Sequence, residues 1–226
     1  KFKYVFFFIL IIKKFRFEKI EFMKKILLIF FLATLFNCER KSEDKEWIYL
    51  FSDKYSSYWK AYNGDTLPKK WKITNNILTF DTDFKLENEY IKGSDIIFSK
   101  EEFGNFELYL EWKLPKGGNS GIFYHLKEGF EETSEVAPEY QLLDDDGWEE
   151  LNKAKLSPWQ KAGADYAMYP PDIEVKKLYP SGEWNSTKII FTEKKVEYWL
   201  NEQKILSFIP WSQDWYERKK NGKWKD

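Results

Sequence analysis

Alternation of apolar and polar side chains is the feature that most restricts the fold of this chain. Between residues 106 and 113 every second residue is apolar and the residues between them are mostly polar, which is typical of a half-buried strand. Residues 187–192, 196–200 and 204–208 continue the pattern, with short polar turns between them. No sustained helical period accompanies them. The sequence therefore predicts an all-β fold, a jelly-roll β-sandwich.

The strand pattern is interrupted in two places. Pro115 to Asn119 contains two glycines and predicts a turn, after which residues 121–126 resume as a strand. Between Phe130 and Pro180 the alternation weakens, and the Asp-Asp-Asp-Gly run at 144–147 indicates a loop. Long ordered loops on a rigid sheet often carry function.

Charge and composition exclude several classes of function. The chain has 36 Lys and Arg against 37 Asp and Glu, so it lacks the positive field that a nucleic-acid partner requires. One cysteine and one histidine provide neither a disulfide framework nor a Cys/His zinc cluster. A divalent metal would therefore need oxygen ligands, and no other cofactor is indicated.

Residues 23–38 have the form of a lipoprotein signal peptide. Two lysines follow Met23, eleven apolar residues come next, and the segment ends in a Leu-Phe-Asn-Cys sequence that resembles a lipobox. Cys38 is then the expected site of lipidation, and the charged residues 39–46 are expected to form a tether. This predicts a lipid-anchored protein of the bacterial cell envelope, periplasmic or at the outer-membrane surface. A chance cysteine after an ordinary signal peptide is the alternative.

Residues 1–22 fit neither the signal peptide nor the domain. The segment begins with Lys1 in place of methionine, and its apolar run from Tyr4 to Ile12 is too short to span a membrane. We interpret it as a non-native extension upstream of a start at Met23. A very short hydrophobic anchor is the alternative. The folded domain is expected to cover residues 47–226.

Several motifs, in order along the chain, resemble the 3-keto-disaccharide hydrolase family, also catalogued as domain of unknown function 1080. The two most specific blocks are Gly-Gly-Asn-Ser-Gly-Ile at 117–122 and Pro-Glu-Tyr-Gln at 138–141. The others are Leu-Phe-Ser-Asp at 50–53, Trp-Lys-Ile at 71–73, Phe-Gly-Asn-Phe-Glu-Leu at 103–108, Gly-Glu-Trp-Asn at 182–185 and Val-Glu-Tyr-Trp-Leu-Asn at 196–201. The resemblance runs from about Trp47 to the end of the chain.

This resemblance implies a concanavalin A-like sandwich that cleaves 3-keto-glycosides, by hydrolysis or by 1,2-elimination followed by hydration. A ketone at C3 acidifies the proton on C2, so one base of modest strength can start the reaction. An ordinary glycosidase instead needs two carboxylates around an intact acetal. An acid or water for the leaving group and polar or metal stabilisation of the enolate would complete the site.

The chain departs from the family pattern at two points. Gly147 and Trp148 stand where family members commonly carry a histidine. Relatives also continue past the position of Asp226 into a further strand. The sandwich is therefore expected to lack that C-terminal strand and to have an open edge.

Carboxylates supply the first candidates for catalysis. Glu139 and Gln141 lie two apart on a predicted strand and so share a face, with Glu139 as base or metal ligand and Gln141 as a ligand of sugar hydroxyls. Glu111, on the polar side of an earlier strand, could join Glu139 across a groove. Asp144 and Asp145 could bind a hard cation. For each of these the alternative is a solvated surface charge.

Further candidates come from the histidine, the glycine block and the tryptophans. His125 has an ordinary pKa near neutrality and is a candidate acid or base, with a merely structural histidine as the alternative. Asn119 and Ser120 follow two glycines that allow close approach to a ligand, and these glycines could equally form only a turn. Tyr124 is a further substrate-binding candidate. Two tryptophans could stack on a sugar ring or lie in the core. They are Trp184 and Trp199.

Three classes of function remain open. The first is an enzyme that cleaves 3-keto-sugar derivatives. The second is a lectin-like domain that binds glycan without chemistry, because fold does not fix function. The third is a structural surface lipoprotein. A carbohydrate partner is expected for the first two.

Overall fold

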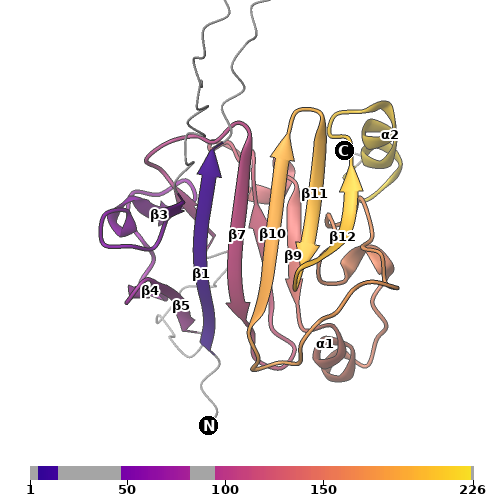
Figure 1. Cartoon of the computed structure of the whole chain (residues 1–226), viewed down its shortest axis with the longest axis horizontal. Coiled ribbons are helices and arrows are strands. Elements are labelled where there is room, and N and C mark those ends of the chain that lie inside the picture. Colours follow the sequence, from indigo (N-terminus) through magenta and orange to yellow (C-terminus); the bar gives the residue numbers. More distant parts are fainter. Residues whose placement is uncertain (1–4, 15–46, 82–94, 225–226) are drawn as a thin grey trace, which may run out of the picture.

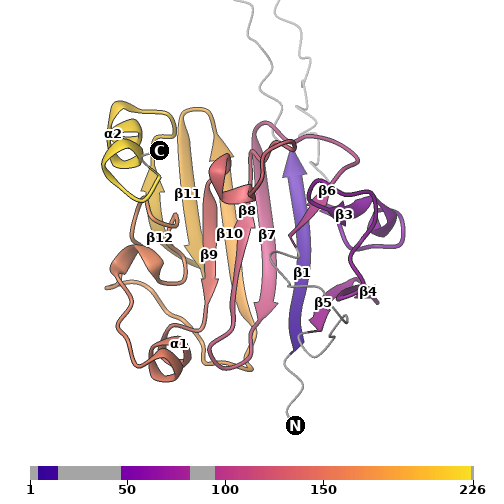
Figure 2. The ribbon, with the colours of Figure 1, turned by 180° about the vertical axis from the view of Figure 1, so that it is seen from behind.

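The computed structural model describes residues 5–14, 47–81 and 95–224, and it is an all-β sandwich, as predicted (Figure 1). One large antiparallel sheet has the strand order β12–β11–β10–β7–β1–β5–β4, with β2 beside β1. Two two-stranded sheets, β8–β9 and β3–β6, accompany it. Figure 2, which views the molecule from the opposite side to Figure 1, shows β8 and β9 in front of the large sheet.

The strands of the large sheet are β1 (Val5–Lys14), β2 (Ile48–Tyr49), β4 (Trp71–Thr74), β5 (Ile77–Asp81), β7 (Phe106–Lys113), β10 (Asn185–Thr192), β11 (Lys195–Leu200) and β12 (Gln203–Phe208). The small sheets contain β3 (Trp59–Ala61), β6 (Ile96–Phe98), β8 (Asn119–Phe123) and β9 (Glu139–Leu143). The helices are α1 (Asp145–Asn152) and α2 (Gln213–Asn221), with 3-10 turns η1 (Ser56–Tyr58), η2 (Thr133–Glu135) and η3 (Pro158–Gln160).

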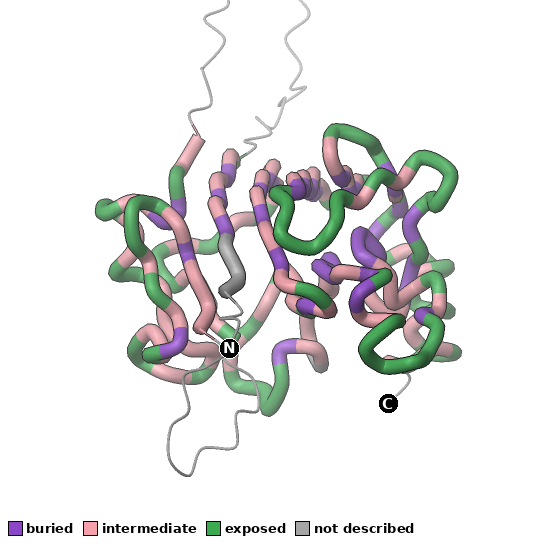
Figure 3. Tube along the Cα trace, turned by 90° about the horizontal axis from the view of Figure 1, so that it is seen from below, coloured by how far each residue is buried: buried purple, intermediate pink, exposed green. Residues whose placement is uncertain are grey.

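The predicted alternation is observed in the large sheet. Buried and half-buried residues alternate along all eight positions of β7 and of β10. The two strands pair antiparallel, with Leu108 opposite Ile189 and Leu110 opposite Thr187. Strands β10, β11 and β12 form the predicted meander. In Figure 3 buried and less buried positions alternate along the strands, and the exposed positions lie mainly on loops.

Strand β9 is hydrogen-bonded along both edges, by β8 on one and by residues 163–166 on the other. Tyr140 faces the large sheet, where its ring contacts Tyr198 at a centroid distance of 4.7 Å. Residues 163–166 run along the edge of β9 opposite β8: the Gln141 amide donates to the Ala164 carbonyl at 3.0 Å, and the Tyr166 amide donates to the Glu139 carbonyl at 2.9 Å. Glu139 and Gln141 therefore share the face opposite Tyr140, as predicted.

Residues 5–14 differ from the prediction, which placed them outside the domain. They form β1, which pairs antiparallel with β7 on one side and with β5 on the other. Phe8, Leu10 and Ile12 on β1 are buried. A short apolar run that pairs on both edges suits the interior of a sheet. In the described part of the chain, β7 thus has a neighbouring strand on each edge. Residues 23–46, with the predicted signal peptide, Cys38 and tether, lie outside the described residues.

Two helices were not predicted. The acidic run at 144–147 forms the start of α1 instead of a loop, with Asp144 at the N-cap position and Asp145 in the first turn. Carboxylates are favourable there because they complement the positive end of the helix dipole. The helix has 8 residues, which is too short to impose a clear helical period on the sequence. No helix among the described residues is long and apolar enough to cross a membrane.

Candidate functional site

A large groove runs between the inner face of the large sheet, strand β8 and the β3–β6 sheet. Its volume is about 1750 Å³, larger than most pockets for small molecules, so it has room for more than one sugar ring. Its lining includes Asp95, Asn119, Ser120, His125 and Glu139. The structure therefore brings together several of the residues that sequence analysis singled out.

Glu139 begins β9 and lies in the groove. It pairs in register with Phe123 on β8, and its side chain reaches across β8 to Gly121. A Cβ atom at Gly121 would lie 1.9 Å from the Glu139 Oε1 atom. The absence of a side chain at position 121 thus provides the space that the carboxylate occupies.

Burial controls the charge of Glu139. Desolvation, with a further contribution from the negative charge of Asp95, raises the pKa of this carboxyl group to about 7, and Lys223 acts in the opposite direction. Among the described residues no cation forms a salt bridge with Glu139. A carboxyl group with a pKa near neutrality can both accept and return a proton at physiological pH.

His125 lies at the rim of the groove, outside the strand that sequence analysis assigned to it. Strand β8 ends at Phe123, and His125 adopts a left-handed backbone with φ of 53°. Its ring contacts Phe191 at a centroid distance of 4.1 Å. Burial lowers the pKa of the imidazole, so His125 is mainly neutral at pH 7 and can donate or accept a hydrogen bond.

Asn119, Ser120 and Gln141 lie close to Glu139 on the small sheet. Gln141 is buried and its Nε2 atom donates to Asn119 Oδ1 at 3.3 Å, so one amide orients the other. Gly118 closes a turn by donating to the Pro115 carbonyl at 2.8 Å. The glycine block therefore forms the predicted turn and also delivers two polar side chains to the groove.

The hydroxyl group of Tyr124 does not reach the groove, contrary to its predicted role in binding substrate. It lies 2.7 Å from the Tyr198 hydroxyl inside the sandwich. Tyr124 is nevertheless one of the residues that line the groove. Tyr124 follows β8 and points toward the large sheet. Alternation in the sequence predicts on which side of the strand a residue lies, but not which residues it contacts there.

The prediction that Glu111 joins Glu139 across the groove is wrong. Leu108 and Leu110 on β7 line the groove, and Glu111 alternates with them, so it points to the outer face of the large sheet. There it accepts a hydrogen bond of 3.0 Å from the Tyr109 hydroxyl.

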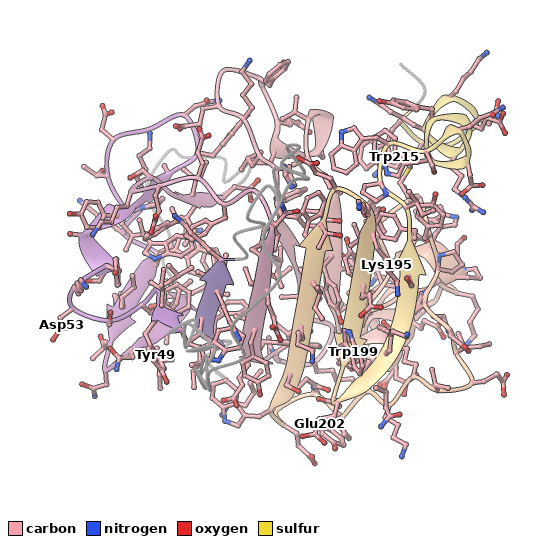
Figure 4. All side chains as sticks on the ribbon, turned by 45° about the horizontal axis from the view of Figure 1, so that its top comes forward. Tyr49, Asp53, Lys195, Trp199, Glu202 and Trp215 are labelled. Atoms are coloured by element: carbon pink, nitrogen blue, oxygen red, sulfur yellow. The ribbon has the colours of Figure 1, made fainter. Side chains whose placement is uncertain are left out.

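Neither predicted sugar-stacking tryptophan lies at the groove. Trp199 projects from the outer face of β11, because its neighbours Tyr198 and Leu200 are buried inside (Figure 4). The Lys188 ammonium covers its ring at 4.4 Å. Trp184 precedes β10, and Lys113 covers its ring at 5.1 Å. Both indoles pair with lysines on the surface instead of with a ligand in the groove.

The two aspartates proposed as metal ligands have other partners. Asp144 Oδ2 accepts from the Gly117 amide at 2.8 Å. Asp145 is buried, accepts from the Ala162 amide at 2.8 Å, and forms a salt bridge of 2.6 Å with Lys176. The described residues contain no group of three or more His, Cys, Asp and Glu side chains suited to a metal ion. These aspartates hold loops together, and they are neither metal ligands nor a solvated turn.

Sequence analysis missed two carboxylates near Glu139. Asp95 lies in the groove and accepts from the Thr133 hydroxyl at 2.6 Å. Asp165 is fully buried behind β9, where its Oδ1 atom accepts from the Tyr198 hydroxyl at 3.4 Å. Its Oδ2 atom has no hydrogen-bond partner in the described part of the chain, and burial raises its pKa to about 8. A lone aspartate among small and apolar residues was the only available signal.

The fold and the groove together define a β-sandwich protein with a buried carboxylate in a ligand-sized groove. More narrowly, the chain belongs to the family of the 3-keto-alpha-glucoside-1,2-lyase-like domain, whose model matches residues 46–225. This confirms the family that the sequence motifs predicted.

Two relatives agree with this placement. The chain is 34% identical over 179 residues to the 3-keto-disaccharide hydrolase of Bacteroides thetaiotaomicron, and the match covers 75% of this chain and 60% of that protein. The chain thus spans about three fifths of the length of this curated relative. A crystal structure of a candidate glycosyl hydrolase from Parabacteroides distasonis is 37% identical, with a TM-score of 0.67. That match covers 79% of this chain and 78% of the other.

Proposed function

We propose that this domain cleaves 3-keto-glycosides, with Glu139 as the general base. One observation carries the proposal: a carboxylate with no salt-bridge partner among the described residues is buried in a groove large enough for a disaccharide. A base with a pKa near 7 matches the proton on C2 of a 3-keto-sugar, which the neighbouring ketone acidifies. The names of the relatives support the same class of substrate.

The reaction begins when Glu139 removes the C2 proton, and the electron pair of that bond enters the enolate of the C3 ketone. The enolate then expels the C1 substituent, whose oxygen leaves with its bonding electrons and takes a proton from water, while neutral His125 can donate a hydrogen bond to that oxygen. A water molecule next adds to C1 through its oxygen and gives its proton to the hydroxide left by the first water, and Glu139 returns its proton to C2. The net change is hydrolysis of the glycosidic bond, and Glu139 ends in its starting form.

Polar side chains of the groove would bind and orient the sugar. Asn119 and Ser120 precede Gly121 on β8 and line the groove, Asn119 on the face of the small sheet that carries Glu139 and Ser120 on the other, so both can hydrogen-bond hydroxyl groups of the ring. We assign no step to a divalent metal, because the described residues do not form a suitable donor cluster. Treatment of the purified protein with a chelator, followed by an activity assay, tests this assignment.

We further propose that the protein is anchored in the bacterial cell envelope through a lipid on Cys38. The basic residues, the apolar run and the cysteine support this proposal. Metabolic labelling with a radioactive fatty acid tests it: wild type should carry label and Cys38→Ser should not. Label on both proteins would reject Cys38 as the site.

The test of the activity is incubation of the purified full chain with a 3-keto-disaccharide. Release of a monosaccharide, or accumulation of a 3-keto-2-hydroxy-glucal, is the expected result. Calorimetry with the same sugar distinguishes the lectin-like alternative. Measurable binding without either product would reject the enzyme and favour a glycan-binding domain.

A further inference from the structure

A pair of tryptophans is stacked at one end of the sandwich. The rings of Trp211 and Trp215 are nearly parallel, with a centroid distance of 5.8 Å and an interplanar angle of 13°. Trp211 remains 45% exposed, although burial of an indole is strongly favourable. Trp215 belongs to the first turn of α2 (Figure 4). A large flat apolar surface left open to solvent indicates a binding surface.

The backbone holds Trp211 in an unusual conformation. Its φ is 57°, in the left-handed region that costs about 1–2 kcal/mol for a residue with a bulky side chain. Its ring packs edge-on against Phe191 and against His125, each at a centroid distance of 5.6 Å. His125 is itself left-handed, with φ of 53°. Two strained residues in contact fix the orientation of the exposed ring, and such strain is concentrated at functional sites.

Trp211 reaches the groove through His125: its ring contacts His125, and His125 lines the groove. His125 is the second residue after Phe123, which ends β8 and is in register with Glu139. Strands β10 and β12 both end on the side of the sheet where α2 lies (Figure 1). Residues 123–125 thus link the two features, because Phe123 pairs with Glu139 and His125 contacts Trp211.

We propose that Trp211 and Trp215 form a second sugar subsite, which binds the leaving-group sugar of a disaccharide substrate. This inference rests on the proposed function, because Glu139 and the residues beside Gly121 bind the 3-keto ring. The apolar face of a pyranose ring stacks on an indole, and the second ring of a disaccharide extends beyond the reacting C1 atom. The subsite therefore selects disaccharides over glycosides with a small leaving group.

The experiment compares kcat/KM for a 3-keto-disaccharide and for methyl 3-keto-glucoside. In Trp211→Asn the ring is removed, and asparagine tolerates the left-handed backbone. We expect kcat/KM to fall about tenfold for the disaccharide and to stay unchanged for the methyl glycoside. Tyr179→Ala, which removes another exposed ring, is the matched control and should change neither value. Equal losses for both substrates, or no loss for the disaccharide, would overturn the subsite.

Two further measurements keep the proposal testable if Trp211→Asn does not fold, which thermal unfolding would reveal. Trp211→Phe keeps an aromatic ring and should give a disaccharide kcat/KM between those of wild type and Trp211→Asn. Wild type alone should prefer the disaccharide to the methyl glycoside by about tenfold. No preference would overturn the subsite. Failure of wild type to cleave either substrate would instead reject the proposed function.

Discussion

The two ends of strand β9 carry carboxylates with opposite surroundings, a half-buried one at its start and a buried one just past its end. At the start of the strand, Glu139 lies in the groove, and no cation pairs with it among the described residues. Just after the end of the strand, Asp145 is paired with Lys176 at 2.6 Å and accepts a backbone hydrogen bond from Ala162. The Asp145 side chain is 11% exposed, and burial of the Glu139 side chain is sufficient to raise its pKa.

The difference shows that burial alone does not make a carboxylate catalytic. A buried charge with a cation and a backbone donor is compensated, and it serves to fix two loops against the sheet. A buried carboxyl group without such partners resists ionisation and keeps a proton near neutral pH. The surroundings therefore give the same chemical group two roles: Asp145 is structural, and Glu139 is a candidate base.

The largest expected effect is loss of catalysis in Glu139→Gln. The amide keeps the size of the side chain and cannot accept a proton, so kcat should fall about 100-fold to 10,000-fold. Steady-state assay with a 3-keto-disaccharide measures this. Glu111→Gln, on the outer face of the sheet, is the matched control and should retain wild-type kcat. Retained turnover in Glu139→Gln would remove Glu139 from the mechanism.

Removal of the Asp145 carboxylate should reduce the stability of the fold and leave kcat unchanged. Asp145→Asn leaves the buried ammonium of Lys176 without its anion, which should lower the free energy of unfolding by about 3 kcal/mol. Urea denaturation measures this, while kcat per folded molecule should stay at the wild-type value. The double variant Asp145→Asn, Lys176→Met should recover most of the loss. An equal loss in the double variant would contradict the ion-pair explanation.

The sequence pattern predicted the position of Glu139 on its strand but not the structural role of Asp145. The alternation in β9 placed Glu139 and Gln141 on one face, since that rule depends only on backbone geometry. The partners of Asp145 come from residues 17 and 31 positions further along the chain, and no local pattern reports them. Sequence analysis therefore read the acidic run as a loop, although it begins α1.

The same limit explains the errors on the large sheet. Alternation predicted which residues of β7 and β11 share a face, but not which face meets the groove. Glu111 and Trp199 were consequently assigned to a site that lies on the other side of the sheet. Strand β1 was missed because its residues are apolar on both faces, as in a strand enclosed by neighbours, and such a run also resembles a short hydrophobic anchor.

Gly121→Ala should weaken catalysis more than stability. The new Cβ would meet Glu139 Oε1 at 1.9 Å and its Cδ atom at 2.7 Å, so the flexible carboxylate would move out of its position. Displacement of a catalytic group by about 1 Å can cost about 100-fold in rate. We expect kcat to fall by that order while the urea midpoint changes little. A loss of stability with unchanged kcat would show that Gly121 serves only the turn.

Activity should depend on the ionisation of Glu139. The pKa of about 7 means that the base is protonated in acid, so kcat/KM should fall about tenfold for each pH unit below that value. Asp95→Asn removes one cause of the raised pKa, and its profile should shift to lower pH. A pH–rate profile of both proteins tests this. Identical profiles would exclude Asp95 as a determinant of the pKa.

The last expected effect leaves catalysis unchanged and concerns Asp165, which is fully buried and does not line the groove. Its pKa rises from 3.8 to about 8 on folding, so between these values the folded protein holds a proton that the unfolded chain has lost. Stability should therefore fall as pH rises through this window, by up to about 1.4 kcal/mol per pH unit. Asp165→Asn mimics the protonated group, so its urea midpoint should fall less between about pH 5 and pH 8, with kcat preserved. A variant with the wild-type slope would show that Asp165 is already ionised in the folded protein, and the contrast with Glu139 would then rest on access to the groove alone.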